Sequence, residues 1–331
     1  MMDLKREGTF GQMLNKSRKI LIVGAAGGLA RILTSILSKA NPEDQIIGVD
    51  SRPQVEEFKR ENVQFLKIRY TRGNFEKLFR DNEFHAVYHL ARMSHAYSNK
   101  SNLAQRLDLN IMGTNRILEL ALKFDVKKMI ILSTYHVYGA LSDNPTFIAE
   151  DAPLKASIKH PELRDVTEMD QLATNWMWKN QHRIETVVLR PCSIIGPQIR
   201  NSMSQYLTTK YVPLGVDFNP MFQFIHEFDM ANILARSLKE VPTGIYNVAP
   251  DEVVSIKKAK EIIGLPTFKI PLITLSPMTL AVKKIWNFPD YLIEYIKFSC
   301  VIDNAELKKH LKDDFLRFST KEALELLKLK L

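Results

Sequence analysis

Short apolar runs alternate with longer amphipathic stretches along the first 190 residues of the chain. Apolar runs of this kind are typical of strands buried in a parallel sheet, and apolar residues at every third or fourth position indicate helices packed on it. Strands are predicted at Lys19–Val23, Val63–Ile68, Ala86–Ala91, Lys128–Ser133 and Glu185–Leu189, and a further strand ends at Asp50. Helices are predicted directly after Lys19–Val23 and at Asn74–Asn82, Leu103–Phe124 and Glu168–Asn180. The alternation predicts an α/β fold with a doubly wound parallel sheet, whose ligand crevice lies at the carboxyl ends of the strands.

Beyond Arg190 the alternation breaks up and proline becomes frequent. Helices are predicted to return at His226–Glu240, Ser255–Ile263 and Thr320–Lys330. A chain of 331 residues exceeds the size at which single cores stop growing, so a second, smaller lobe is expected. We predict a polar extension at 1–18, a large domain at 19–192 with contributions from about 223–248, and a C-terminal substrate-binding lobe at 193–222 and 249–331.

A glycine-rich turn follows the first predicted strand. Gly24, Gly27 and Ala30 have the spacing G-x-x-G-x-x-A, in which the first glycine makes the tight turn and the second lets backbone approach a pyrophosphate. The helix N-terminus that follows favours a phosphate, because its N–H groups are unpaired and its dipole is positive there. Asp50 lies about twenty residues beyond the turn, where a carboxylate can bind the adenosine ribose. Together these features predict a Rossmann-type dinucleotide-binding domain.

Composition narrows the class of protein. With 45% hydrophobic and 25% charged residues, the chain is typical of globular proteins without membrane spans, and no apolar run approaches the ~20 residues that a span needs. The net charge of +9 is dispersed, which favours a solvated surface and sites for an anionic ligand over nucleic-acid binding. Two cysteines and the lack of an apolar N-terminal segment suit a cytoplasmic protein. The apolar and basic segment Lys269–Val301 is expected to pack within the lobe, the alternative being association with a membrane surface.

No metal site or known nucleophile motif is predicted. His85 and His89 would lie about 13 Å apart along a strand, which is too far to share one ion. Cys192 is expected to be a small buried residue.

Several motifs in order resemble the extended short-chain dehydrogenase/reductase superfamily, which contains nucleotide-sugar epimerases and dehydratases. Besides the glycine turn, the matching segments are His89-Leu90-Ala91, Asn110 with Gly113-Thr114, Ser133–Gly139, Leu189-Arg190-Pro191 with Gly196-Pro197, Phe224-Ile225-His226 with Asp229, and Gly244–Val248. The resemblance runs from about Lys19 to Leu329 and implies the fold more specifically than the reaction.

The resemblance also implies a catalytic set of Ser or Thr, Tyr and Lys, supported by an Asn. Asn110 and Thr134 match two of these positions, but Arg164 and Glu168 stand where the Tyr-x-x-x-Lys pair is expected. A glutamate at that place would make a phenolate harder to form, whereas lysine makes it easier. The Y-x-x-x-K at Tyr206–Lys210 falls in the lobe and is interpreted as chance. The candidates for the catalytic groups are therefore Thr134, Tyr138, His136 and Glu168, with Asp170 as a further possible base.

The expected cofactor is NAD, with NADP as the alternative. Asp50 favours a free ribose diol because a carboxylate repels a 2′-phosphate, whereas Arg52 or Arg69 could pair with that phosphate. The residues predicted to bind the cofactor are Gly24, Gly27, Gly28, Leu29, Asp50, Ser51, Arg52, Arg69, Leu90, Ala91, Asn110, Ser133 and Pro191.

Two classes of function remain open at this point. The first is an NAD(P)-dependent oxidoreductase of the epimerase/dehydratase kind, with non-standard catalytic residues. Its substrate by resemblance is a nucleotide sugar, whose diphosphate Arg190, Arg200 and Lys210 could meet; a lipid- or steroid-like alcohol is the alternative, because Leu272–Phe298 is rich in apolar and aromatic residues. The second class is a catalytically silent NAD(P)-binding sensor or assembly protein. A homodimer formed through the long sheet helices is possible in either case.

Overall fold

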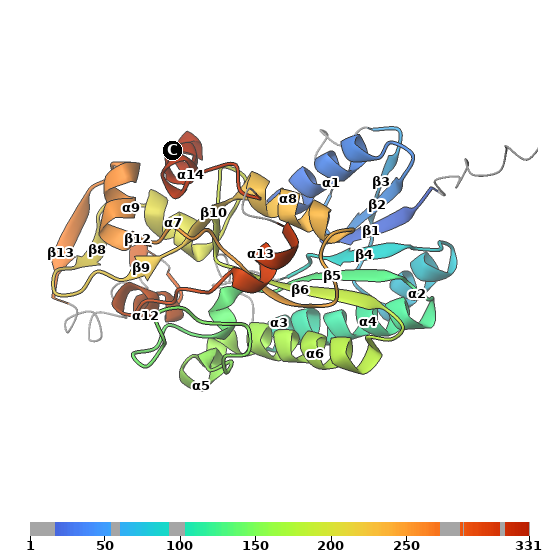
Figure 1. The fold of residues 1–331 in the computed structure, drawn as a ribbon, viewed down its shortest axis with the longest axis horizontal. Coiled ribbons are helices and arrows are strands. Elements are labelled where there is room, and N and C mark those ends of the chain that lie inside the picture. Colours follow the sequence, from blue (N-terminus) through green and yellow to red (C-terminus); the bar gives the residue numbers. More distant parts are fainter. Residues whose placement is uncertain are drawn as a thin grey trace, which may run out of the picture.

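Seven parallel strands form the central sheet of the protein (Figure 1). The computed structural model describes residues 17–53, 60–92, 103–271, 285–286, 288–311 and 315–330. The strands are β1 (Lys19–Val23), β2 (Gln45–Asp50), β3 (Val63–Lys67), β4 (Ala86–His89), β5 (Lys128–Leu132), β6 (Glu185–Pro191) and β11 (Gly244–Val248), in the spatial order β3-β2-β1-β4-β5-β6-β11. The doubly wound sheet predicted from the sequence is confirmed.

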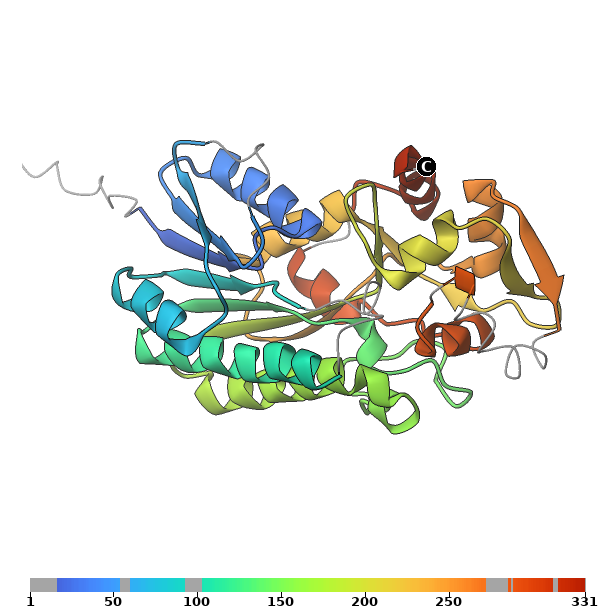
Figure 2. The same ribbon diagram turned by 180° about the vertical axis from the view of Figure 1, so that it is seen from behind.

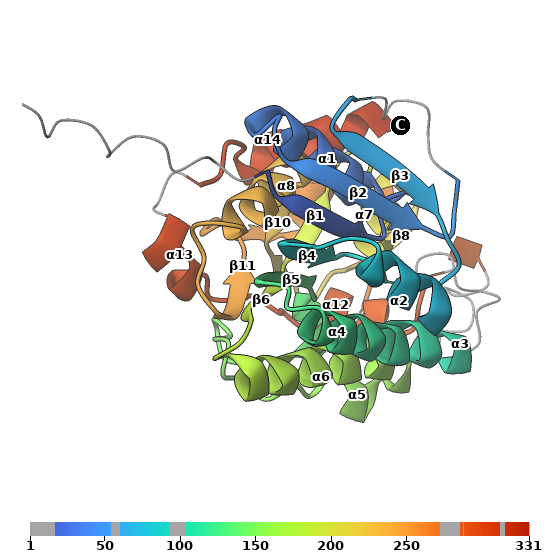
Figure 3. The ribbon, with the colours of Figure 1, turned by 90° about the vertical axis from the view of Figure 1, so that its right-hand side faces the viewer.

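Helices cover both faces of the sheet, as the views along and across it show (Figures 2 and 3). On one face lie α1 (Gly28–Ala40) and α8 (Glu227–Ser237), and on the other lie α2 (Arg72–Arg80), α4 (Gly113–Lys123) and α6 (Arg164–Asn180). Two hydrophobic clusters, one on each side of the sheet, form the core. The register places Val23 of β1 beside Val49 and His89. The carboxyl ends of these three strands therefore meet at one edge, where the ligand crevice is expected.

The helix predicted at Leu103–Phe124 is interrupted. It consists of α3 (Leu103–Leu107), one π-helical turn (Asp108–Met112) and α4. Such π turns in α-helices often mark functional positions, and this one contains Asn110. Helix α6 begins at Arg164, four residues before the predicted start, and follows a single 3₁₀ turn over Pro161–Leu163.

Short two-stranded sheets and helices make up most of the region that the sequence predicts as a smaller lobe. The strand pairs are β7 (Ser193–Ile195) with β10 (Phe224–His226), β8 (Val212–Gly215) with β13 (Thr267–Ile270), and β9 (Met221–Phe222) with β12 (Val254–Ser255). The helices beyond the sheet are α5 (Ala156–Lys159), α7 (Ser202–Thr208), α9 (Ile256–Ile263), α12 (Tyr291–Lys297), α13 (Ala305–Leu311) and α14 (Thr320–Leu327). None of the helices in the described ranges is long and apolar enough to cross a membrane.

Candidate active site

The glycine-rich turn holds its backbone against two neighbouring strand ends. Gly24 has φ +90°, and its N–H donates to the carbonyl of Val49 at 2.9 Å. A Cβ at Gly24 would lie 2.7 Å from the backbone of Ala91, and one at Gly28 would lie 2.5 Å from the carbonyl oxygen of Gln198. A side chain at either place would therefore collide with backbone, so this close packing requires glycine at both positions.

Helix α1 begins at this turn without a capping side chain. Its N-cap is Gly27, which makes no side-chain hydrogen bond to the first turn of the helix. No acidic residue stands in that first turn. The helix N-terminus therefore presents its N–H groups and the positive end of its dipole to the adjoining cleft, as a pyrophosphate requires.

A cleft of about 930 Å³ opens in front of the turn. Among its lining residues are the predicted Gly24, Gly27, Gly28, Leu29, Asp50, Ser51, Arg52, Leu90 and Ala91, together with Arg31, Ile68, Tyr70, Arg92, Leu109 and Arg200. The size, the glycine-built wall and the helix N-terminus fit a dinucleotide.

Asp50 closes β2 at the cleft. Its Oδ2 accepts a hydrogen bond from the N–H of Ala26 at 3.0 Å, and its carboxylate receives the backbone and the side chain of Arg52. Although burial raises the pKa of Asp50, the hydrogen bonds from Arg52 outweigh it and hold the pKa below its ordinary value. The carboxylate is thus ionised and ready to accept ribose hydroxyls, while Arg52 neutralises part of its charge.

Arg69 is exposed and does not line the cleft. The residues on either side of it, Ile68 and Tyr70, line the cleft instead. The structure therefore offers an apolar and aromatic wall at the place where the sequence suggested a cation.

Asn110 supports the site from below and lines neither cavity. It is fully buried, and its side-chain amide donates to Asp165 Oδ2 at 2.7 Å. Leu109 of the same π turn lines the cleft. The neighbouring Thr114 contacts His89 Nε2 through its hydroxyl at 2.8 Å, which joins this helix to the end of β4.

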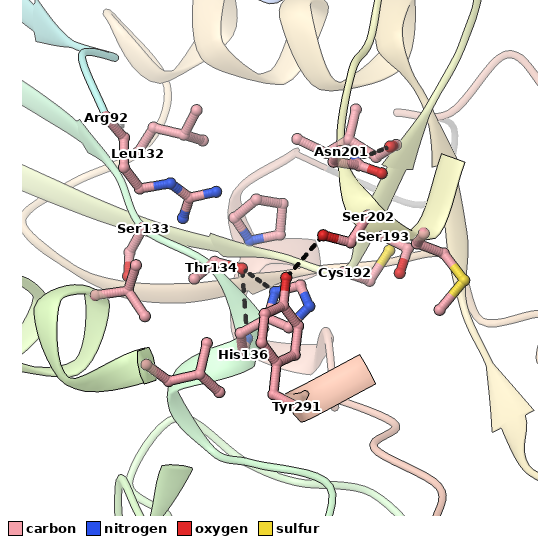
Figure 4. Close-up of a pocket in the computed structure, with 15 residues that line it drawn as sticks. Arg92, Leu132, Ser133, Thr134, His136, Cys192, Ser193, Asn201, Ser202 and Tyr291 are labelled. Atoms are coloured by element: carbon pink, nitrogen blue, oxygen red, sulfur yellow. Dashed lines mark hydrogen bonds between the residues drawn. The ribbon is translucent and has the colours of Figure 1, made fainter. Parts of the chain in front are cut away.

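A second, smaller cavity of about 80 Å³ adjoins the cleft. Figure 4 shows the residues that line it. Arg92, Leu132, Ile194 and Asn201 line both cavities, so the two are continuous. The remaining lining residues are Ser133, Thr134, His136, Leu163, Val166, Pro191, Cys192, Ser193, Ser202, Met203 and Tyr291. Ser133 and Pro191, which the sequence assigned to the cofactor, are among them.

Thr134 and His136 form a hydrogen-bonded couple in the small cavity. Thr134 Oγ1 lies 2.8 Å from His136 Nδ1, and the same oxygen accepts the N–H of His136 at 3.3 Å (Figure 4). The imidazole packs among the rings of Tyr135, Tyr291 and Tyr295, with centroids 4.4 to 5.4 Å away. The couple therefore consists of a hydroxyl and an imidazole held in fixed relation in a cavity beside the dinucleotide cleft.

Tyr138 lies behind this cavity in a buried polar network. Its hydroxyl donates to Asn247 Oδ1 at 2.8 Å and accepts from Arg190 at 2.9 Å. Burial raises its pKa to about 12. Arg190 also forms a buried ion pair with Asp170, at 2.6 Å, and Ser133 donates its hydroxyl proton to the same carboxylate. One hydrogen-bonded network through Asp170 therefore connects Tyr138, Ser133 and Arg190. Because its guanidinium is used in this network, Arg190 is not placed to meet a substrate diphosphate.

Helix α6 turns Glu168 away from the cavity. Arg164 and Glu168 form an ion pair one turn apart, with 59% and 37% of their side chains exposed. Leu163 and Val166 line the cavity in their place. Residues three apart share a helix face, so this register points the apolar pair inward and the charged pair outward. The two charged residues at the positions where the resemblance implies an acid and a base thus face away from the cavity.

The Y-x-x-x-K segment at Tyr206–Lys210 serves the packing of the lobe. Tyr206 is fully buried and donates to the carbonyl of Pro213 at 2.7 Å, while Lys210 is exposed. Lys260 donates to the carbonyls of Leu207 and Thr209, closing the C-terminus of α7. The segment lies outside both cavities.

Part of the segment Leu272–Phe298 lies outside the described residues. In the part that the structure describes, Phe288, Leu292 and Ile296 belong to the core cluster. Tyr291 lines the small cavity, with its hydroxyl 3.0 Å from that of Ser202. Packing accounts for these residues, as the sequence led us to expect.

Among the lining residues that the sequence reasoning missed are Arg92, Asn201, Ser202 and Tyr291. Arg92 directly follows the His89-Leu90-Ala91 motif and could have been found there. Tyr291 comes from a distant segment, so no local signal marks it. Within the described ranges, no group of three or more His, Cys, Asp or Glu side chains is placed to hold a metal ion.

A family model described as "NAD dependent epimerase/dehydratase family" matches residues 20–249. The chain belongs to this family. It is 24% identical over 243 residues to an uncharacterized protein of Mycobacterium tuberculosis, covering 72% of this chain and 64% of that protein, and 27% identical to Protein CapI of Staphylococcus aureus, covering 67% and 70%. Among solved structures, it resembles UDP-glucose 4-epimerase of Thermotoga maritima with UDP-glucose (TM-score 0.71, 18% identity, 94% and 98% covered). It also resembles dTDP-glucose 4,6-dehydratase of Bacillus anthracis in complex with NAD (TM-score 0.71, 17% identity, 95% and 96% covered).

Proposed function

We propose that this protein is an NAD-dependent enzyme of the epimerase or dehydratase kind, acting on a hydroxyl or keto group of a nucleotide sugar. The observation that carries the proposal is the Thr134–His136 couple, 2.8 Å apart in a cavity continuous with the dinucleotide cleft. One protein of similar fold, MoeE5, was solved in complex with UDP-glucose and NAD. The family membership supports NAD as the cofactor.

The residues of the cleft are suited to hold the cofactor. The backbone at Gly24, Gly27 and Gly28 and the N-terminus of α1 would receive the pyrophosphate, and Asp50 would receive the adenosine ribose. Bound NAD supplies the removal and return of a hydride at a carbinol carbon. The chain itself must bind the reacting oxygen, move its proton and exclude water.

Thr134 and His136 are the pair proposed for that proton. The Thr134 hydroxyl would hydrogen-bond the reacting oxygen, and the His136 imidazole would accept the proton through Thr134. Histidine side chains titrate near neutrality, which suits general acid–base catalysis. Tyrosine rings pack against His136, and the apolar Leu163 and Val166 line the cavity, so the couple lies beside apolar surface, where a hydrogen bond is stronger than in open water. Glu168 and Tyr138 are given no catalytic role, because neither lines the cavity.

One observation favours a second candidate, a catalytically silent NAD-binding protein. Arg164 and Glu168 stand where the resemblance implies the acid and base, and neither lines the cavity. In this case the protein would still bind NAD in the cleft but would catalyse no reaction.

Two measurements separate the candidates. The first is the thermal stability of the full chain with NAD and NADH, which must rise if the cleft binds them. The second is incubation with NAD and a panel of nucleotide sugars, followed by analysis for keto or epimerised products. Binding with turnover supports the enzyme, and binding without turnover of any sugar supports the silent protein. An absence of stabilisation by either nucleotide would contradict both.

A further inference from the structure

Arg92 occupies the junction between the two cavities. It follows β4 after Leu90 and Ala91, and it lines both the dinucleotide cleft and the small cavity. Its guanidinium group points into the small cavity from the side opposite Asn201 (Figure 4). A ligand that reaches Thr134 must therefore pass close to this cation.

No carboxylate pairs directly with Arg92. No Asp or Glu is among the residues that line the small cavity, and within the described ranges Arg92 makes no hydrogen bond or ion pair. The nearby Asp165 carboxylate attracts the Arg92 charge from a distance, but its direct contacts are with Asn110 at 2.7 Å and Arg106 at 3.5 Å. In the cleft, Asp50 is engaged by Arg52. A guanidinium that faces a cavity without a paired carboxylate favours an anionic ligand, and its planar donors match a carboxylate in two parallel hydrogen bonds.

We propose that Arg92 binds a carboxylate on the sugar, so that the substrate class is a nucleotide sugar with an acidic ring substituent. This inference rests on the function proposed above and names the substrate of the same site. Arg92 and Thr134 line the same small cavity, so a single sugar can present an anionic group to Arg92 and its reacting hydroxyl to Thr134. In a hexuronate the carboxylate and the 4-hydroxyl stand on adjacent carbons, whereas the diphosphate is attached across the ring. A carboxylate meets this constraint better than the diphosphate.

The test compares two ligands that differ only at carbon 6, UDP-glucuronate and UDP-glucose. Their dissociation constants for the full chain are measured with saturating NAD, together with the dissociation constant of NAD itself. We expect the acidic sugar to bind at least about tenfold more tightly, as one charge-assisted bidentate contact allows. In Arg92→Gln the preference disappears while NAD binding is unchanged, and Arg92→Lys keeps part of the preference. Arg164→Gln is the matched control, because Arg164 is exposed outside both cavities.

Three results would overturn the inference. The first is that the unchanged protein binds the two sugars with equal affinity, or binds neither. The second is that Arg92→Gln lowers the affinity for both sugars equally. The third is that Arg92→Gln lowers the affinity for NAD. The last result would assign Arg92 to the cofactor pyrophosphate. A preference for the acidic sugar without turnover would sustain this inference and contradict the proposed activity. Turnover of both sugars without a preference for the acidic one would support the proposed activity and contradict this inference.

Discussion

The dinucleotide cleft and the small cavity are built by different means, although they share a wall. The cleft is formed mainly by backbone: a glycine turn against neighbouring strand ends and an uncapped helix N-terminus. The small cavity is formed by side chains from distant segments, including β5, α6, α7 and α12. Backbone sites depend on a few glycines and tolerate change elsewhere, whereas side-chain sites can exchange one chemical group for another on the same fold. The two sites should therefore respond differently to mutation.

The comparison predicts that the Thr134–His136 couple can be disabled without loss of NAD binding. Thr134→Val and His136→Gln should each lower kcat by about 10² to 10⁴-fold, the usual contribution of a positioned proton-transfer group. Thr134→Ser is the control, since it keeps the hydroxyl that contacts His136 Nδ1. Turnover with a nucleotide sugar and NAD affinity are measured on the same preparations. Full activity in His136→Gln would show that the proton leaves by another route.

The network behind the cavity should matter for stability more than any ion pair on the surface. Asp170 is fully buried and binds both Arg190 and Ser133. Asp170→Asn leaves the Arg190 charge without its partner, so the free energy of unfolding should fall by about 3–5 kcal/mol. Denaturant titration measures this value. Glu240→Gln is the control, because it breaks an exposed pair with Arg236 and should cost less than about 0.5 kcal/mol. Equal effects of the two changes would contradict the role given to the network.

A charge placed in the glycine turn tests the cleft alone. In Gly27→Asp a carboxylate enters the space where the pyrophosphate is expected, so NAD affinity should fall on the order of 100-fold through like-charge repulsion. Gly73→Asp is the matched control, because a side chain at Gly73 in the first turn of α2 meets open space. Isothermal titration with NAD and thermal unfolding measure both variants. Unchanged affinity in Gly27→Asp would mean that this turn does not hold the cofactor.

Much of the cleft could be predicted from the sequence, because its physical requirements are local. The spacing of Gly24 and Gly27 and the distance to Asp50 reveal the turn, the helix N-terminus and the strand end. The cavity could be predicted only in part. Thr134 and His136 lie two residues apart at one strand end and were found, whereas Tyr291 reaches the cavity from a distant helix. The orientation of Glu168 could not be predicted from the sequence either. A shift of one residue in the register of α6 decides whether this side chain faces the cavity or the solvent.

The smallest effect is expected at Arg52, which is at the edge of the cleft with 62% of its side chain exposed. Its hydrogen bonds help to hold the pKa of Asp50 below its ordinary value despite burial. A carboxyl group with a lowered pKa stabilises the folded state above its unfolded pKa near 3.9, and this contribution is lost as the pH falls through the folded value. Arg52→Gln should therefore raise the midpoint of acid unfolding slightly, in the region below about pH 4, and change NAD affinity by no more than a few-fold. If Arg52→Gln instead weakened NADP binding far more than NAD binding, Arg52 would be a 2′-phosphate ligand. The cofactor preference of the cleft would then depend on a side chain, as the chemistry of the small cavity does.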